Sequence, residues 1–229
     1  MSLISLKDKK TRPVVLWTTG LFICACVAVF LRFSIAYGII FPVGILTVAS
    51  LWLCPWQISL ALLFSVIGDY MGSCGQFIGQ MGFVAAAHIM YVIYFIRRYL
   101  EKVERDRKLT EKAKGFTILI ILMCLFVAGV AFSRIIINAP AGVIRTGAGI
   151  YAILICTMLA MALLQRSSLY ALGALLFVFS DFILAWNKFT SPIENAGLLI
   201  MIPYYLGQWL LYIRSTPFRV GPEMRLMRF

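Results

Sequence analysis

The sequence predicts an all-α polytopic membrane protein with eight transmembrane helices. Of its 229 residues, 62% are hydrophobic and only 13% are charged, whereas soluble domains usually contain about a quarter charged residues. A helix of roughly 20 apolar residues crosses about 30 Å of hydrocarbon. Because such stretches take up nearly the whole chain, we expect one eight-helix transmembrane domain over residues 1–229 and no soluble domain. The stretches are residues 14–31, 34–53, 57–73, 77–96, 116–133, 143–164, 168–187 and 196–213.

The residues at the ends of these stretches and between them indicate how the stretches begin, pack and connect. The first stretch follows a basic segment, as in a signal peptide, but the seven stretches after it favour an uncleaved first helix. Glycines spaced four residues apart, such as Gly68 and Gly72, suit close packing of the third helix against the fourth. The segment 97–115 alternates bases with acids, which is typical of a solvated helix extension.

The segment 97–115 divides the predicted helices into two groups of four. The phrases at residues 61–69 and 174–181 are similar, and each lies in the third helix of its group. This placement suggests a parallel four-plus-four repeat, as in some transporters.

The net charge of +12 is explained by membrane topology. With a cytoplasmic N-terminus, 17 of the 21 Lys and Arg residues lie on the cytoplasmic side, and Arg32, Arg134, Arg145 and Lys188 lie opposite. Cytoplasmic loops are enriched in Lys and Arg, and these residues attract anionic lipid. We therefore expect both termini to be cytoplasmic and no nucleic-acid partner. The expected membrane is a bacterial inner membrane, or the endoplasmic reticulum of a eukaryote.

The metal-binding residue types do not form a site pattern. Six cysteines are scattered without paired CxxC spacing, and the chain has one histidine. This distribution indicates neither a disulfide framework nor a zinc site, so we expect no metal and no cofactor.

Asp69 and Asp181 lie deep inside apolar stretches that otherwise avoid charge. A charged side chain in hydrocarbon costs roughly 2.5 to 3.5 kcal/mol on insertion scales, so such residues are usually functional. The helical rise places both carboxylates about 18 to 20 Å from the cytoplasmic boundary, and His88 about 14 Å from it. The sequence therefore predicts that these three side chains share one level of the membrane.

Other polar residues fall in the same central zone. His88 and Tyr91 lie on one face of the fourth stretch, and the eighth stretch adds Tyr204, Tyr205 and Gln208. Polar residues on buried helices suggest a cavity facing the interior of the bundle.

Paired carboxyl groups indicate acid–base chemistry. Two carboxyls close together cannot easily both ionise, so a protonated acid and an ionised base coexist, as general acid–base hydrolysis requires. Nothing resembles GxSxG, a phosphate loop or a dinucleotide fingerprint. Three classes remain: an intramembrane hydrolase, a proton-coupled lipid or small-molecule carrier, and an intramembrane aspartyl protease. The protease is less favoured because residues 66–69, Val-Ile-Gly-Asp, lack the first glycine of the GxGD pattern.

Several motifs together resemble the YhhN/TMEM86 family of eight-span membrane proteins, which includes lysoplasmalogenases. The most specific motif is Gly-Ala-Leu-Leu-Phe-Val-Phe-Ser-Asp-Phe-Ile-Leu-Ala at residues 173–185. One departure is Phe41 before Pro42, where many relatives carry lysine, and it leaves the head-group preference open. The supporting motifs are residues 64–69, residues 87–91, Tyr151 with Met158, Lys188 with Phe189, and residues 204–208.

The resemblance implies hydrolysis of the vinyl ether bond of lysoplasmalogens to a fatty aldehyde and a glycerophospho-head-group. Asp69 and Asp181 are then the expected catalytic pair, with either one as the acid, and His88 is expected to orient water or tune a carboxyl. The expected partners are a lysophospholipid substrate and the bilayer, and the oligomeric state stays open. A proton-coupled carrier that uses the same acids is the alternative. The expected substrate-binding residues are Tyr91, Arg145, Tyr151, Ser180, Lys188, Tyr204, Tyr205 and Gln208.

Overall fold

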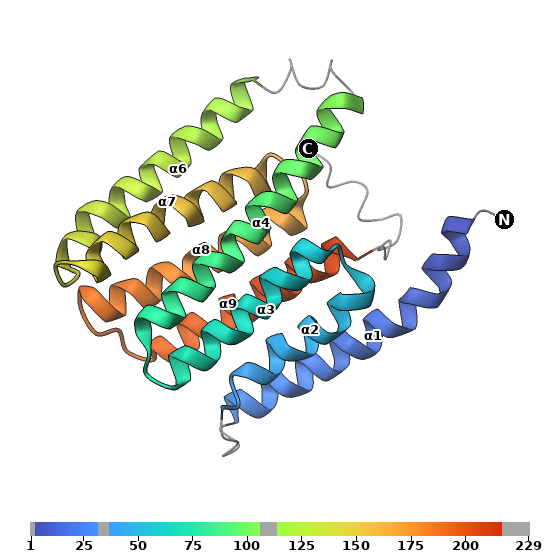
Figure 1. Ribbon diagram of the computed structural model, residues 1–229, viewed down its shortest axis with the longest axis horizontal. Coiled ribbons are helices and arrows are strands. Elements are labelled where there is room, and N and C mark those ends of the chain that lie inside the picture. The colour runs from blue at the N-terminus through green and yellow to red at the C-terminus, as the bar shows by residue number, and fades with distance from the viewer. Residues whose placement is uncertain (1–2, 32–36, 106–113, 217–229) are drawn as a thin grey trace.

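A computed structural model describes residues 3–31, 37–105 and 114–216, and within these ranges every regular element is helical (Figure 1). Each of the eight predicted stretches contains an α-helix. The largest differences are that α1 begins at Leu3 instead of residue 14, that α4 ends at Arg105 instead of residue 96, and that α2 begins at Ile40 instead of residue 34. The elements are α1 (Leu3–Phe30), α2 (Ile40–Leu53), α3 (Trp56–Ser73), α4 (Phe77–Arg105), α6 (Lys114–Arg134), the 3₁₀ helix η1 (Ile136–Asn138), α7 (Val143–Leu163), α8 (Ser168–Phe189) and α9 (Ala196–Ser215).

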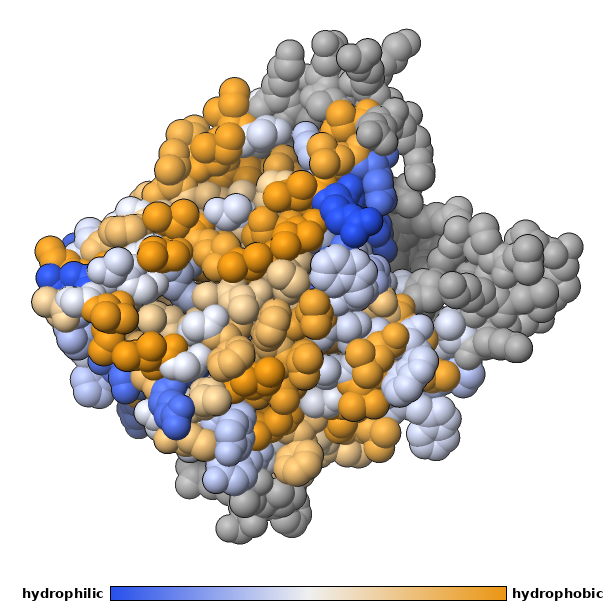
Figure 2. Space-filling view, in the orientation of Figure 1, coloured by the Kyte–Doolittle hydropathy of each residue, from blue (hydrophilic) through white to orange (hydrophobic). Residues whose placement is uncertain are grey.

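The helices have the length and composition of membrane spans. Within the described ranges six of them, α1, α4, α6, α7, α8 and α9, are long and apolar enough to cross a membrane. Helix α2 is shorter, with 14 residues, and α3 contains Asp69 among several polar residues. Hydrophobic side chains cover the middle of the face in Figure 2, and strongly hydrophilic ones gather near its ends. The chain is therefore an all-α, integral multi-pass membrane protein, and the count of eight spans and the internal repeat stay predictions.

Part of the predicted solvated segment is helical. Helix α4 runs beyond the predicted span to Arg105, so the first half of segment 97–115 continues the helix. Residues 106–113 lie outside the described ranges. The same holds for several bases used in the topology prediction: Arg32, Arg107, Lys108, Lys112, Arg219, Arg225 and Arg228.

Glycine brings α3 and α4 together, as the spacing predicted. A Cβ atom added to Gly68 would lie 2.6 Å from Cγ2 of Val84, and one added to Gly72 would lie 2.7 Å from the side chain of Gln80. The chain reverses between the two helices at Gly75, whose φ of 74° is a left-handed conformation that suits glycine. The backbones approach because no side chain separates them.

Helices α8 and α9 form a second close pair through Gly173 and Gly207. A Cβ atom on Gly207 would lie 2.9 Å from the carbonyl oxygen of Gly173, and one on Gly173 would lie 3.2 Å from that of Gly207. Each glycine therefore accommodates the backbone of the other helix.

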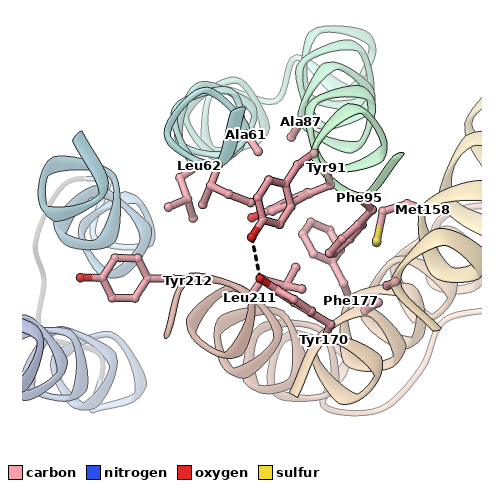
Figure 3. Close-up of a cluster of buried hydrophobic side chains, with 14 of the residues drawn as sticks. Ala61, Leu62, Ala87, Tyr91, Phe95, Met158, Tyr170, Phe177, Leu211 and Tyr212 are labelled. Carbon is pink, nitrogen blue, oxygen red and sulfur yellow. Dashed lines mark hydrogen bonds between the residues drawn. The ribbon is translucent and has the colours of Figure 1, made fainter. Parts of the chain in front are cut away.

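The two hairpins, α3 with α4 and α8 with α9, lie at the centre of the bundle (Figure 1). Helix α7 packs against α4 and α8. Helices α1 and α2 pack against α9, and α6 lies on the outside of the bundle, against α7. Buried side chains of α3, α4, α7, α8 and α9 fill the space between them (Figure 3). They include Leu62, Tyr91, Met158, Phe177 and Leu211, and this apolar core holds the two aspartate-bearing helices in place.

Candidate active site

Asp69 lies near the end of α3 and is bonded to a tyrosine of α9. Its exposed fraction is 7%, and the hydroxyl of Tyr204 donates to its Oδ2 at 2.9 Å. Tyr204 follows Pro203, which lies inside α9 and has no N–H for an intrahelical bond. The carboxylate is therefore held between the two central hairpins.

Asp181 lies on α8 and is bonded to a tyrosine of α7. The hydroxyl of Tyr151 donates to its Oδ2 at 2.5 Å. Its side chain is 14% exposed, and the same oxygen is 3.7 Å from Nε2 of His88. Each catalytic candidate thus has a phenol donor of its own.

His88 of α4 is completely buried, with an exposed fraction of 0%. Its Nδ1 lies 2.7 Å from the carbonyl oxygen of Val84. Because a carbonyl only accepts, the proton of the neutral ring is on Nδ1, and Nε2 carries a lone pair. Among the described residues Nε2 has no hydrogen-bond partner, and 3.7 Å from Asp181 is too long for a direct bond. A buried, unpaired nitrogen facing a carboxylate suits a small polar ligand such as water.

The ring of Phe177 joins the two halves of the site. It meets His88 edge-on, with ring centres 4.6 Å apart, and meets Tyr204 at 5.4 Å. Tyr204, which binds Asp69, and His88, which faces Asp181, thus contact the same ring. The structure therefore brings Asp69, Asp181 and His88 together. Phe177 was not predicted as a site residue, although it lies four residues before Asp181 and hence on the same helical face.

A second polar layer lies about one helical turn from the carboxylates. The hydroxyl of Tyr91 donates to Oε1 of Gln208 at 2.7 Å, and Nε2 of Gln208 donates to Oγ of Ser65 at 2.9 Å. Ser65 was also missed from the sequence, although it lies four residues before Asp69. This layer ties α3, α4 and α9 together beside the site.

Two predicted substrate-binding residues point their hydroxyls elsewhere. Ser180 donates to the carbonyl oxygen of Ile200 at 2.9 Å. The hydroxyl of Tyr205 donates to the carbonyl oxygen of Ile39 at 2.9 Å, and the Tyr205 ring meets the ring of Phe22 of α1 edge-on. Both side chains hold helices and loops together in this conformation.

Lys188 and Arg145, predicted near the outer boundary, are exposed. The Lys188 ammonium lies 5.1 Å from the centre of the Phe77 ring, and Nε of Arg145 donates to the carbonyl oxygen of Ala139 at 2.9 Å. Lys188 is seven residues beyond Asp181, which corresponds to about 10 Å along the helix. Neither Lys188 nor Arg145 contacts the carboxylate of Asp69 or Asp181.

The donor set of the site is two carboxylates, two phenols and one imidazole. Within the part of the chain that the structure describes, no group of three or more His, Cys, Asp or Glu residues could hold a metal ion. Such a set can move protons and hold water.

Comparisons with known proteins agree on one family. The YhhN family model matches residues 39–215. Lysoplasmalogenase TMEM86B of Sus scrofa is 33% identical over 155 residues, which cover 66% of this chain and 59% of that protein. The human TMEM86B lysoplasmalogenase is 30% identical over 162 residues, 68% of this chain and 61% of that protein.

A bovine relative matches over a longer range. Lysoplasmalogenase TMEM86A of Bos taurus is 28% identical over 220 residues, which cover 90% of this chain and 82% of that protein. The chain thus spans about three fifths of the pig and human proteins and most of the bovine one. No solved structure matches the chain.

Proposed function

The chain belongs to the YhhN family, and on this premise we propose that it is a lysoplasmalogenase, an intramembrane hydrolase of the vinyl ether bond. Its products are a fatty aldehyde and a glycerophospho-head-group. The observation that carries the proposal is the meeting of Asp69, Asp181 and the unpaired Nε2 of His88 in one buried site. The lysoplasmalogenase relatives support the choice of substrate.

The surroundings of the two carboxylates favour different roles. Nε2 of His88 has a free lone pair beside Asp181, so this side of the site can hold a water molecule and take a proton from it. Among the described residues, the Tyr204 phenol is the hydrogen-bond partner of the Asp69 carboxyl, and the imidazole of His88 faces Asp181 instead. We therefore assign Asp69 as the acid, and Asp181 with His88 as the base that activates water.

The proposed reaction begins with proton transfer from Asp69 to the alkene carbon remote from the ether oxygen. The product is an oxocarbenium ion, which the ionised Asp181 stabilises. Water adds to the carbon next to oxygen as Asp181 and His88 take its proton, forming a hemiacetal. The hemiacetal proton moves to the glycerol oxygen as the carbon–oxygen bond breaks, which releases aldehyde and alcohol. One water is consumed, and returning the proton to Asp69 completes the cycle.

The lipid is proposed to enter sideways from the bilayer, with its chain in hydrocarbon and its head-group near the outer ends of α7 and α8. A phosphate there is within reach of Lys188 and Arg145, which are exposed near those ends. The separation of about 10 Å along α8 between Asp181 and Lys188 suits the glycerol between the phosphate and the vinyl ether. Tyr204 and Tyr151 are then donors beside the reacting bond.

The proposed function is tested by measuring aldehyde release from an alkenyl lysophospholipid with the purified full chain in detergent. We expect turnover without any ion gradient, because hydrolysis needs only water and the two carboxyls. A proton-coupled carrier with the same buried acids would release no aldehyde under these conditions. A matched alkyl ether lipid is the control substrate, since it has no alkene carbon to protonate.

We further propose that both termini and the segment near Arg105 face the cytoplasm. The motivation is the split of 17 bases against four in the sequence. Cysteine labelling in intact cells is expected to modify an added residue near Arg105 only after the membrane is permeabilised. Labelling of this position from outside would reverse the orientation, and a cysteine added beside Lys188 should show the opposite accessibility.

A further inference from the structure

Two arginines share one tyrosine ring at the end of the bundle opposite Lys188. The guanidinium carbon of Arg98, on α4, lies 5.5 Å from the ring centre of Tyr170 on α8. The guanidinium carbon of Arg214, on α9, lies 5.3 Å from the same ring centre. Three helices thus bring two cations to one aromatic side chain.

Neutral partners fix the position of both guanidinium groups. Arg98 donates to the hydroxyl of Tyr94 at 3.4 Å, and that hydroxyl lies 2.6 Å from the hydroxyl of Tyr170. Nε of Arg214 donates to Oγ of Ser167 at 3.0 Å. These contacts place the two cations before any ligand binds.

The described residues use little of the hydrogen-bonding capacity of the two arginines. A guanidinium group has five N–H donors. Arg98 and Arg214 each donate one hydrogen bond to the described residues. Nε of Arg98 is buried without a partner among them. Neither arginine makes an ion pair with a described carboxylate, and the acid beside Arg98 is the exposed Glu101, three residues further along α4.

We propose that Arg98 and Arg214 form a binding site for the phosphate group of an anionic membrane phospholipid. Guanidinium groups bind phosphate through paired N–H donors, and they stack on aromatic rings. Tyr170 is positioned at the start of α8, where an apolar helix meets the membrane boundary. Lys102, which donates to the carbonyl oxygen of Gln165, adds positive charge nearby.

This site is separate from the proposed active site. Arg98 lies ten residues after His88, which is about 15 Å along α4, too far for the phosphate of a lipid whose vinyl ether reaches the carboxylates. The bound lipid would instead hold α4, α8 and α9 together. These helices carry His88, Asp181 and Tyr204, so the inference does not depend on the reaction, although the lipid would stabilise the site that performs it.

The test is the thermal unfolding of the full-length purified chain in a non-ionic detergent with added dioleoylphosphatidylglycerol, dioleoylphosphatidylcholine or inorganic phosphate. At a concentration well above Kd, phosphatidylglycerol is expected to raise Tm by roughly 5 °C, and the other two additives by much less. The double variant Arg98→Gln, Arg214→Gln should lose this shift. Arg97→Gln is the control, because Arg97 is exposed on the adjacent position of α4.

Several outcomes would overturn the proposal. An unchanged shift in the double variant, or an equal loss in Arg97→Gln, would mean that the lipid acts through general charge. An equal effect of inorganic phosphate would assign the site to a soluble anion. If the glutamine pair does not fold, Arg98→Lys with Arg214→Lys keeps the charge but loses the planar donors. That pair should lose at least half of the shift, and a full shift would contradict phosphate binding by the guanidinium groups.

Discussion

Replacing Asp69 or Asp181 by asparagine is expected to reduce aldehyde release by at least roughly a hundredfold, because general acid–base catalysis contributes factors of this size. An amide is nearly the same shape as a carboxyl group, and it still accepts the phenol hydrogen bond from Tyr204 or Tyr151. It cannot deliver the proton to carbon or take one from water. The measurement is the initial rate of aldehyde release by each purified variant.

Matched variants separate chemistry from folding. Glu194→Gln makes the same carboxyl-to-amide change at an exposed position between α8 and α9, and should keep the wild-type rate. His88→Ala should reduce the rate less than either asparagine, since His88 assists Asp181. Full activity in either asparagine variant would refute the paired-carboxylate mechanism. Failure of both to fold, judged by thermal unfolding, would mean that the pair serves structure.

The second large effect is expected from Gly207→Ala, which adds one methyl group between α8 and α9. Its Cβ would lie 2.9 Å from the carbonyl oxygen of Gly173 and 3.2 Å from the backbone nitrogen of Phe177. Backbone atoms cannot turn aside as a flexible side chain does, so the two helices must separate. Overpacking of this kind typically costs about 1–3 kcal/mol, and we expect a clear fall in Tm.

The same change should also lower activity, because the separation moves Tyr204 of α9 and Phe177 of α8. Gly197→Ala is the control on the same helix, since a Cβ there meets no atom within 4 Å. It should leave both Tm and the rate of aldehyde release unchanged. If Gly207→Ala is as stable as Gly197→Ala, the close glycine contact is not what holds α8 against α9.

The hydropathy pattern was sufficient to locate the helices. A helix in a membrane satisfies its own backbone hydrogen bonds and needs an apolar surface, and both requirements are local properties of the sequence. The predicted stretches therefore agree closely with α3 and with α6 to α9. The start of α2 was less well predicted, because residues 34–39 are also apolar and hydropathy alone does not mark a helix end.

The same local reasoning predicted residues of the candidate site without giving their partners. The cost of a charge in hydrocarbon singled out Asp69 and Asp181, and the helical rise placed them at one level with His88. The motif resemblance named Tyr151 and Tyr204, but not which carboxylate each would contact. Ser65 and Phe177 were missed, since serine and phenylalanine are ordinary residues in apolar helices.

By itself the sequence determined that this is a helical membrane protein of the YhhN family with two buried acids. Only the tertiary structure decided that Tyr204 binds Asp69, that Tyr151 binds Asp181, and that the free nitrogen of His88 faces Asp181. The physical reason is how much of the chain each property depends on. Burial and helix formation depend on each segment and its solvent, whereas a hydrogen bond depends on how helices far apart in the chain rotate and approach. Here that approach is set by glycines such as Gly207, where an added Cβ atom would lie only 2.9 Å from the carbonyl oxygen of Gly173.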